Sequence, residues 1–231
     1  MKELLHTLQI QLAGKAIEEQ FSCLLDYFPG RISFSTSFGQ EDQVLTDIIC
    51  RHRLAVRIFT IDTGRLFYET YELIDKTRAR YNTKIEVYFP DHQSVERMVT
   101  KKGLFSFYES VENRIECCQI RKVEPLGRAL IGVSVWVTGL RAQQSANRHD
   151  MPLLQWDEEK NLFKFNPLLH WRYEDVIDYI RKNDVPDNPL HRKGFISIGC
   201  APCTRAIEPG EDPRAGRWWW ETSKKECGLH K

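Results

Sequence analysis

Apolar and polar residues follow one another along the chain in a pattern that predicts alternating strands and helices. Short apolar runs at residues 31–34, 55–61, 84–89 and 133–138 predict four buried strands. Apolar residues at helical spacing predict helices over 1–26, after residue 40, over 66–80 and over 117–130. Strands that alternate with helices form parallel sheets with helices on their faces. We therefore expect an α/β fold with a twisted parallel sheet.

The second half of the chain has a different texture. Residues 153–156 and 162–165 predict two further short strands, and residues 173–182 predict a helix. Beyond Val185-Pro186 the chain is rich in Pro, Gly, Arg and Trp. Since no internal repeat or linker interrupts the sequence, we expect one domain over residues 1–231. It would comprise an N-terminal helix (1–30), an α/β core (31–185) and an irregular C-terminal segment (186–231).

Composition and charge narrow the class of protein. The 231 residues are 42% hydrophobic and 28% charged, which is typical of a globular domain. The net charge of +1 provides no general surplus for binding a polyanion or an anionic membrane surface. The apolar runs are too short to span a bilayer, and the first residues lack the pattern of an export signal. We expect a cytoplasmic protein that binds neither nucleic acid nor membrane.

A loop rich in hydroxyl groups follows the first predicted strand. The residues Ser35-Thr36-Ser37-Phe38-Gly39 lie between a strand and a helix. At this position α/β proteins bind phosphate through backbone N–H groups and the positive end of the helix dipole. The pattern G-x-x-x-x-G-K-[ST] is absent, which argues against an ordinary P-loop NTPase. The loop could equally serve as a helix cap, so both interpretations stay open.

A second loop, Asp62-Thr63-Gly64, follows the second predicted strand. Ligands of open α/β sheets bind at the carboxyl ends of the strands. Asp62 could therefore accept hydrogen bonds from a ribose or an adenine. From this motif alone, the favoured interpretation is instead that Asp62 caps the helix that begins near Leu66.

Four of the seven cysteines form two close pairs, Cys117-Cys118 and Cys200-Ala201-Pro202-Cys203. Disulfides are rare in a reducing compartment, whereas four thiolates suit a zinc ion or an iron–sulfur cluster. Side chains of adjacent residues diverge and chelate one small ion poorly, which favours a [4Fe–4S] cluster over zinc. Incidental buried cysteines and a redox-active C-x-x-C remain as alternatives.

Cys227 and several arginines are further candidates for chemistry. Lys224, Lys225 and His230 are cations that would favour the thiolate of Cys227, the nucleophilic form, although a cysteine near a chain end is often incidental. Guanidinium groups bind oxyanions in two-point geometry, so Arg141, Arg214 and Arg217 point to a small anionic substrate rather than a polyanion. The alternative is that they are surface arginines without a role.

Together these motifs resemble those of the assimilatory adenylyl-sulfate and phosphoadenylyl-sulfate reductases. The resemblance covers residues 31–230, and its most specific elements are the paired cysteines, residues 210–221 and the terminal Glu226-Cys227-Gly228-Leu229-His230. It implies an adenine nucleotide α-hydrolase-like fold related to the ATP pyrophosphatases. It also implies reduction of an activated sulfate to sulfite through an S-sulfocysteine, which thioredoxin or glutaredoxin then resolves.

The resemblance also implies residue roles. Cys227 would be the nucleophile, and Cys117, Cys118, Cys200 and Cys203 would bind the cluster with Lys122 beside it. Ser35, Thr36, Ser37, Phe38 and Gly39 would bind phosphate, and Asp62, Thr63 and Gly64 the nucleoside side. Arg141, Arg214 and Arg217 would hold the phosphosulfate.

The nucleotide and the wider function leave alternatives. Cluster-bearing members of the family usually prefer adenylyl sulfate, and Glu41 and Asp42 would repel an added 3′-phosphate if they face it. A reductase of the 3′-phosphorylated substrate, or of both, is the alternative. More distant alternatives are a PP-loop tRNA sulfurtransferase, which needs a broader basic surface, and a non-enzymatic redox-sensing iron–sulfur domain. A homo-oligomer is compatible with the sequence.

Overall fold

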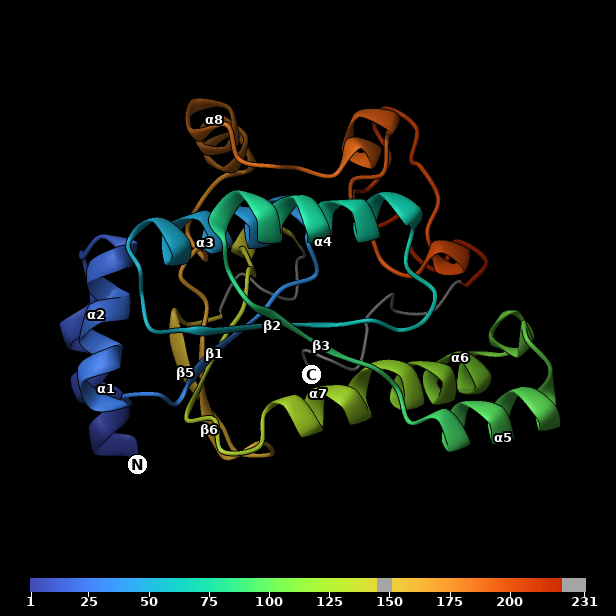
Figure 1. The fold of residues 1–231 in the computed structure, drawn as a ribbon, viewed down its shortest axis with the longest axis horizontal. Coiled ribbons are helices and arrows are strands. Elements are labelled where there is room, and N and C mark those ends of the chain that lie inside the picture. Colours follow the sequence, from blue (N-terminus) through green and yellow to red (C-terminus); the bar gives the residue numbers. More distant parts are fainter. Residues whose placement is uncertain (145–150, 222–231) are drawn as a thin grey trace. The chain divides into compact units, whose positions relative to one another are not determined.

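The structure is a computed structural model, and it describes residues 1–144 and 151–221. A six-stranded sheet has the strand order β3-β2-β1-β4-β6-β5 (Figure 1). Its strands are β1 (Ile32–Ser35), β2 (Arg57–Ile61), β3 (Ile85–Tyr88), β4 (Val135–Val137), β5 (Leu154–Asp157) and β6 (Leu162–Phe165). Each of these strands lies at one of the six positions that the apolar runs predict.

Helices alternate with the strands along most of the chain. They are α1 (Lys2–Leu12), α2 (Ile17–Tyr27), α3 (Gln40–Arg51), α4 (Tyr68–Tyr81), α5 (His92–Lys102), α6 (Val111–Cys118), α7 (Glu124–Ala129) and α8 (Tyr173–Asn183). A π-helical turn, Gln119–Val123, connects α6 to α7. The expected α/β fold is confirmed.

Strand β5 is an exception to the expected parallel sheet. β1 pairs in parallel with β2 and with β4, and β4 pairs in parallel with β6. β5 is antiparallel to β6, with Leu154 opposite Phe165. Residues 158–161, which connect them, are too few for the crossover that a parallel pair requires. Asn161 adopts the left-handed conformation in this short turn (φ 53°).

Two expected helices are divided in the structure. The single helix expected over residues 1–26 is two helices, α1 and α2, because Gly14 between them has a φ of 71°. Leu12 and Ile17 are both buried on either side of the break, so the apolar spacing alone did not show it. The helix expected over 117–130 begins earlier, at Val111, and consists of α6, the π-helical turn and α7.

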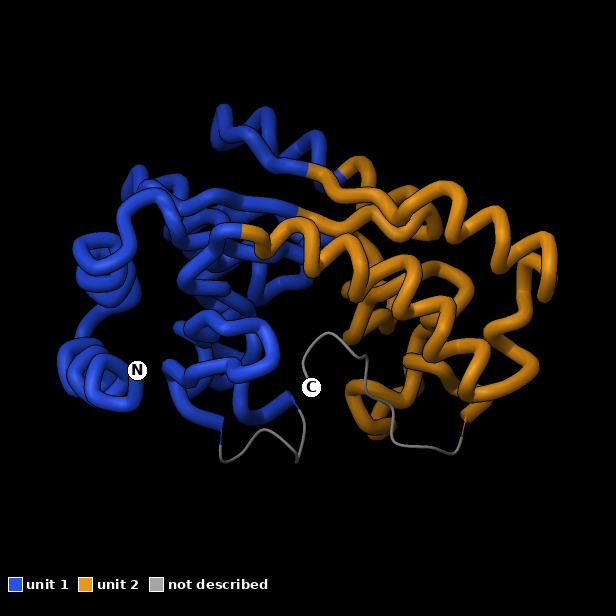
Figure 2. Tube along the Cα trace, turned by 90° about the horizontal axis from the view of Figure 1, so that it is seen from below, with its two compact units in different colours: residues 1–59, 73–86, 132–188 blue, residues 60–72, 87–131, 189–231 orange. Residues whose placement is uncertain are grey.

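The chain forms two compact units (Figure 2). Unit 1 comprises Met1–Phe59, Leu73–Glu86 and Gly132–Asn188, and unit 2 comprises Thr60–Glu72, Val87–Ile131 and Pro189–Lys231. The core of unit 1 is aliphatic and aromatic, with Phe21 meeting Phe165 edge-on at 5.4 Å. The core of unit 2 is smaller and contains Phe107, Trp218 and four cysteines. Among the described residues, none of the helices has the length and apolar character needed to cross a membrane.

Candidate active site

The loop Ser35–Gly39 of unit 1 joins β1 to α3 in a turn that leaves the start of the helix without a side-chain cap. Gly39 is the residue before α3, and within the described residues no side chain bonds to the first turn as a cap from this position. Thr36 N–H donates to the Phe59 carbonyl at 2.8 Å, and Phe38 has a φ of 61°. Helix N–H groups without a side-chain cap suit an anion. The structure thus argues against the cap, and phosphate binding by this loop stays a prediction, because the N–H groups of Ser37 and Phe38 bond within the protein to Asp42 and Thr36.

The carboxylate of Asp42, in the first turn of α3, accepts two hydrogen bonds from Ser37 of the same loop. Ser37 donates to its carboxylate from the backbone N–H at 2.6 Å and from Oγ at 2.7 Å. Burial raises the pKa of Asp42 to about 6, against the lowering effect of these two hydrogen bonds. A side chain at residue 139 would collide with this carboxylate, so Gly139 leaves the space that Asp42 fills.

Arg141, which follows β4, reaches the same loop region. Its Nε donates to Glu41 at 2.8 Å, and its guanidinium lies 5.5 Å from the centre of the Tyr173 ring. Tyr173 in turn donates its hydroxyl to Gln40 at 2.9 Å. Arg141 Nη1 is buried and has no hydrogen-bond partner among the described residues. The structure thus places an N–H donor on Arg141 that a bound anion could use, and it adds Tyr173, which the sequence analysis missed.

The turn Asp62-Thr63-Gly64 lies in unit 2 and is built around the Asp62 carboxylate. Asp62 Oδ1 accepts from Gly64 N–H at 2.7 Å and from the Tyr71 hydroxyl at 2.9 Å. The capping alternative for Asp62 is therefore wrong, because its carboxylate closes its own turn and α4 begins only at Tyr68. Thr63 connects this turn to the thiols, since its Oγ1 lies 3.2 Å from Cys200 Sγ.

Arg121 also binds the turn Asp62-Thr63-Gly64. Its Nη1 donates to the Thr63 carbonyl at 2.7 Å, and its Nε is buried without a hydrogen-bond partner among the described residues. Arg121 comes from the π-helical turn directly after the adjacent cysteines. A π-helical turn has no simple sequence signal, so the role of Arg121 could not be predicted from the sequence.

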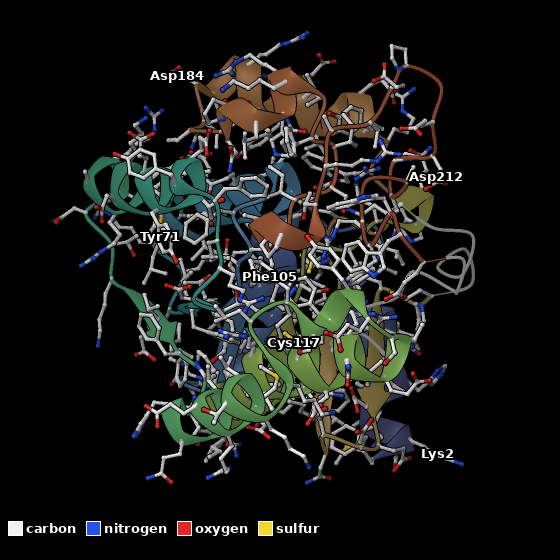
Figure 3. All side chains as sticks on the ribbon, turned by 90° about the vertical axis from the view of Figure 1, so that its right-hand side faces the viewer. Lys2, Tyr71, Phe105, Cys117, Asp184 and Asp212 are labelled. Carbon is white, nitrogen blue, oxygen red and sulfur yellow. The ribbon has the colours of Figure 1, made fainter. Side chains whose placement is uncertain are left out.

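All four paired cysteines line one pocket in unit 2. Cys117 and Cys118 end helix α6, while Cys200 directly precedes the 3₁₀ turn Ala201–Cys203, which Cys203 ends (Cys117 is labelled in Figure 3). Each is buried. The remaining lining comprises two aromatic residues and four cations, Phe107, Trp218, Arg65, Arg114, Arg121 and Lys122. The structure thus brings together the two cysteine pairs and Lys122, as the sequence analysis expects.

The four cations that line this pocket favour an anionic group, and its four thiols favour a group that sulfur can ligate. Burial, and then the neighbouring Cys200, raises the pKa of Cys203 to about 12, and burial likewise raises the pKa of Cys117. Metal ligation would displace these protons. N–H donors without partners among the described residues include Trp218 Nε1, Arg65 Nη1 and Arg121 Nε, so the lining can donate to sulfur atoms. In the described part of the chain, no group of three or more His, Cys, Asp or Glu side chains is placed so that it could hold a metal ion.

Arg217 and Arg214 belong to the C-terminal segment of unit 2. Arg217 is buried, stacks 4.8 Å from the centre of the Trp218 ring, and has an Nε without a hydrogen-bond partner among the described residues. Gly199 allows its close approach, because an added Cβ would lie 2.6 Å from Arg217 Cζ. Arg214 is half-buried, and its N–H donates to Asp212 at 2.8 Å. Cys227 lies outside the described residues.

Fold and site together define a class: an α/β protein with an anion-binding type of loop and a four-thiol pocket. Residues 31–206 match the model of the phosphoadenosine phosphosulfate reductase domain, and the chain belongs to this family.

Individual relatives agree. The chain is 56% identical over 201 residues, 87% of this chain and 78% of the other, to an adenosine 5′-phosphosulfate reductase of Allochromatium vinosum. The crystal structure of a Candida auris phosphoadenylyl-sulfate reductase in a phosphate complex is 30% identical, with a TM-score of 0.76, covering 90% of this chain and 98% of that one. An FMN adenylyltransferase of Candida glabrata shares the fold alone, at 18% identity and a TM-score of 0.56 over 94% and 73%. The expected adenine nucleotide α-hydrolase-like fold is thereby confirmed.

Proposed function

We propose that this protein reduces adenylyl sulfate to sulfite and AMP in sulfate assimilation, in the cytoplasm. The observation that carries the proposal is the four-thiol pocket in a chain that is 56% identical to a protein named adenosine 5′-phosphosulfate reductase. The uncapped start of α3 and the donors of Arg141 support binding of the phosphosulfate. The turn at Asp62 would bind the nucleoside. Arg214 and Arg217, together with Arg141, would hold the phosphosulfate.

The reaction has two steps. The Cys227 thiolate attacks the sulfonate sulfur, the sulfur–oxygen bond to the phosphate breaks, and AMP leaves with that electron pair. Cys227 then carries an S-sulfonate. A thiolate of a dithiol protein, thioredoxin or glutaredoxin, attacks Cys227 Sγ and expels sulfite, and the partner's second thiol resolves the mixed disulfide. Two electrons pass from the dithiol to sulfur, and Cys227 regains its thiol. Cationic groups around the phosphate stabilise the charge that develops on AMP.

The four pocket cysteines are proposed ligands of a [4Fe–4S] cluster. The fit depends on their shared pocket, on the unpartnered N–H donors of Trp218, Arg65 and Arg121, and on the cationic lining. When bound, such a cluster would hold the two cysteine segments together and place a fixed charge near Lys122. The chain's own residues bind the substrate and supply the nucleophile.

Adenylyl sulfate is proposed over its 3′-phosphorylated form. The relatives at 50–56% identity are named for adenosine 5′-phosphosulfate, while the Candida auris structure at 30% is named for the 3′-phosphorylated compound. The carboxylates of Glu41 and Asp42 lie directly after the phosphate loop. Comparing kcat/KM for the two substrates tests this choice, and an advantage for the 3′-phosphorylated substrate would reverse it.

A labelling experiment tests the nucleophile. The protein is incubated with adenylyl [³⁵S]sulfate without reductant, and the label retained on the chain is measured. We expect labelling that Cys227→Ser abolishes and that the control Cys23→Ser preserves, because Cys23 packs against the core of unit 1 and donates to Gln11 there. Labelling that survives Cys227→Ser would reject Cys227 as the nucleophile.

A further inference from the structure

A buried ion pair joins helix α6 to the last described residue of the chain. Arg114 donates from Nε to Glu221 Oε1 at 3.0 Å and from Nη2 to Oε2 at 2.8 Å. The two side chains are only 5% and 4% exposed. The Arg114 guanidinium also lies 4.8 Å from the centre of the Trp218 ring. Such a two-point contact fixes the orientation of the carboxylate as well as its distance.

Stability alone is a weak explanation for this pair. Desolvating two charges costs about as much as their attraction returns, so apolar residues of the same size would serve stability equally well. What a buried two-point pair supplies is a defined position. Apart from an isolated bridge between Arg217 and Thr204, the segment from residue 205 to Glu221 consists of turns, bends and irregular chain, so individual contacts decide where it lies. These contacts include the Trp218 N–H bond to the Cys203 carbonyl at 3.2 Å and the Arg114–Glu221 pair.

The same guanidinium belongs to the thiol pocket. Arg114 lies three residues before Cys117 on α6 and lines the pocket together with all four cysteines. Trp218, on which it stacks, is part of the same buried cluster. One side chain therefore contacts both the proposed cluster pocket and the start of the segment that leads to Cys227.

We propose that the Arg114–Glu221 pair is a positioning device that anchors the Cys227 segment at the wall of the thiol pocket. This inference rests on the proposed role of Cys227 and adds residues that control where it can act. With Glu221 anchored, chain geometry keeps the Cys227 Cα within about 20 Å, at about 3.4 Å for each of six residues. Without the pair, the last anchor is Trp220, which packs against Phe107 and Tyr108, and seven residues extend the limit to about 24 Å.

A longer tether lowers the effective concentration of the nucleophile. The fall follows roughly the −3/2 power of tether length, which gives about a 1.3-fold loss when six residues become seven. Disturbing the orientation in which the segment leaves the pocket adds to this loss. The device should therefore affect attack by Cys227 and leave binding of adenylyl sulfate unchanged.

The test compares Glu221→Gln with Glu211→Gln. Both changes remove a carboxylate of the C-terminal segment that binds an arginine at two points, but Glu211 pairs with Arg205, six residues before it, and is one-third exposed. Arg114→Lys, which keeps the charge and loses the two-point contact, is a milder second variant. Three quantities are measured: amide hydrogen exchange at residues 218 and 221, iron content, and the single-turnover rate of adduct formation on Cys227.

We expect Glu221→Gln to raise amide exchange at residues 218 and 221 at least about tenfold. The adduct rate should fall at least about 1.3-fold, with iron content and the Kd for adenylyl sulfate unchanged. Arg114→Lys should produce smaller changes in the same direction, and Glu211→Gln none.

Three results would contradict either the anchoring role of the Arg114–Glu221 pair or the proposed role of Cys227. Unchanged exchange and adduct rate in Glu221→Gln overturn the inference. Loss of iron in parallel with the rate also overturns it, because the pair would then serve the pocket rather than the segment. If the wild-type protein itself forms no adduct on Cys227, the proposed function fails, and the exchange measurement still decides whether the pair anchors residues 218–221.

Discussion

Replacing Asp42 by Asn should stabilise the protein, and more so at neutral than at acidic pH. Burial raises the pKa of Asp42 from its ordinary 3.8 to about 6 in the folded chain. The folded state therefore binds this proton more tightly than the unfolded state. The stabilising contribution of protonated Asp42 is fully present below the pKa that Asp42 has in the unfolded chain, and it is lost as the pH rises from about 4 to about 6. Since one pKa unit corresponds to about 1.4 kcal/mol, the ionised carboxylate costs about 3 kcal/mol above pH 6.

Asparagine retains an oxygen that can accept from Ser37, while its side chain does not ionise in this range. Urea unfolding of both proteins at about pH 4.5 and about pH 7.5 gives the free energies to compare. The stability gain of Asp42→Asn should be about 2 kcal/mol larger at the higher pH. Asp91, whose pKa its hydrogen bonds to Ser94 lower, is an exposed control in which Asn should bring no such gain. A gain that does not depend on pH would refute the assigned burial cost.

Three further predictions follow from named contacts. Cys203→Ser should remove iron and the absorbance near ~400 nm that a four-thiolate cluster gives, whereas Cys23→Ser should retain both. A colourless wild-type protein that contains zinc would contradict this prediction. Gly139→Ala should lower the free energy of unfolding by about 1–3 kcal/mol, since its Cβ meets the Asp42 carboxylate, and an unchanged urea midpoint would disprove the clash. Tyr173→Leu should raise KM more than Tyr173→Phe, because only Phe keeps the ring beside Arg141; equal KM values would exclude that role.

The strands could be predicted from the sequence because each is a short apolar run between polar turns. All the described strands lie where those runs occur, from Ile32–Ser35 to Leu162–Phe165. Breaks within helices were harder to predict, because the apolar spacing continues from Leu12 to Ile17 across Gly14. Helix α5 was not predicted because its apolar stripe is short: it consists of Val95, Met98 and Val99, and only Met98 is buried.

The site residues that the sequence indicated belong to compact motifs. The cysteine pairs and the two loops at strand ends can be recognised from spacing alone. The residues that were missed act through contacts distant in sequence. Tyr173 stacks on Arg141, Arg121 bonds to the Thr63 carbonyl, and Glu221 pairs with Arg114, 107 residues away. Only the folded chain brings these partners together, so a single sequence carries no local signal for them.

The central claim is that Cys227 forms a covalent bond to the sulfonate sulfur of adenylyl sulfate. Peptide mass spectrometry after a single turnover without reductant tests it most directly. We predict that the peptide containing Cys227 gains the mass of one SO₃ group, in proportion to the AMP released, and loses it as sulfite when reduced thioredoxin is added. Release of sulfite by a chain whose Cys227 peptide never gains that mass would contradict the account.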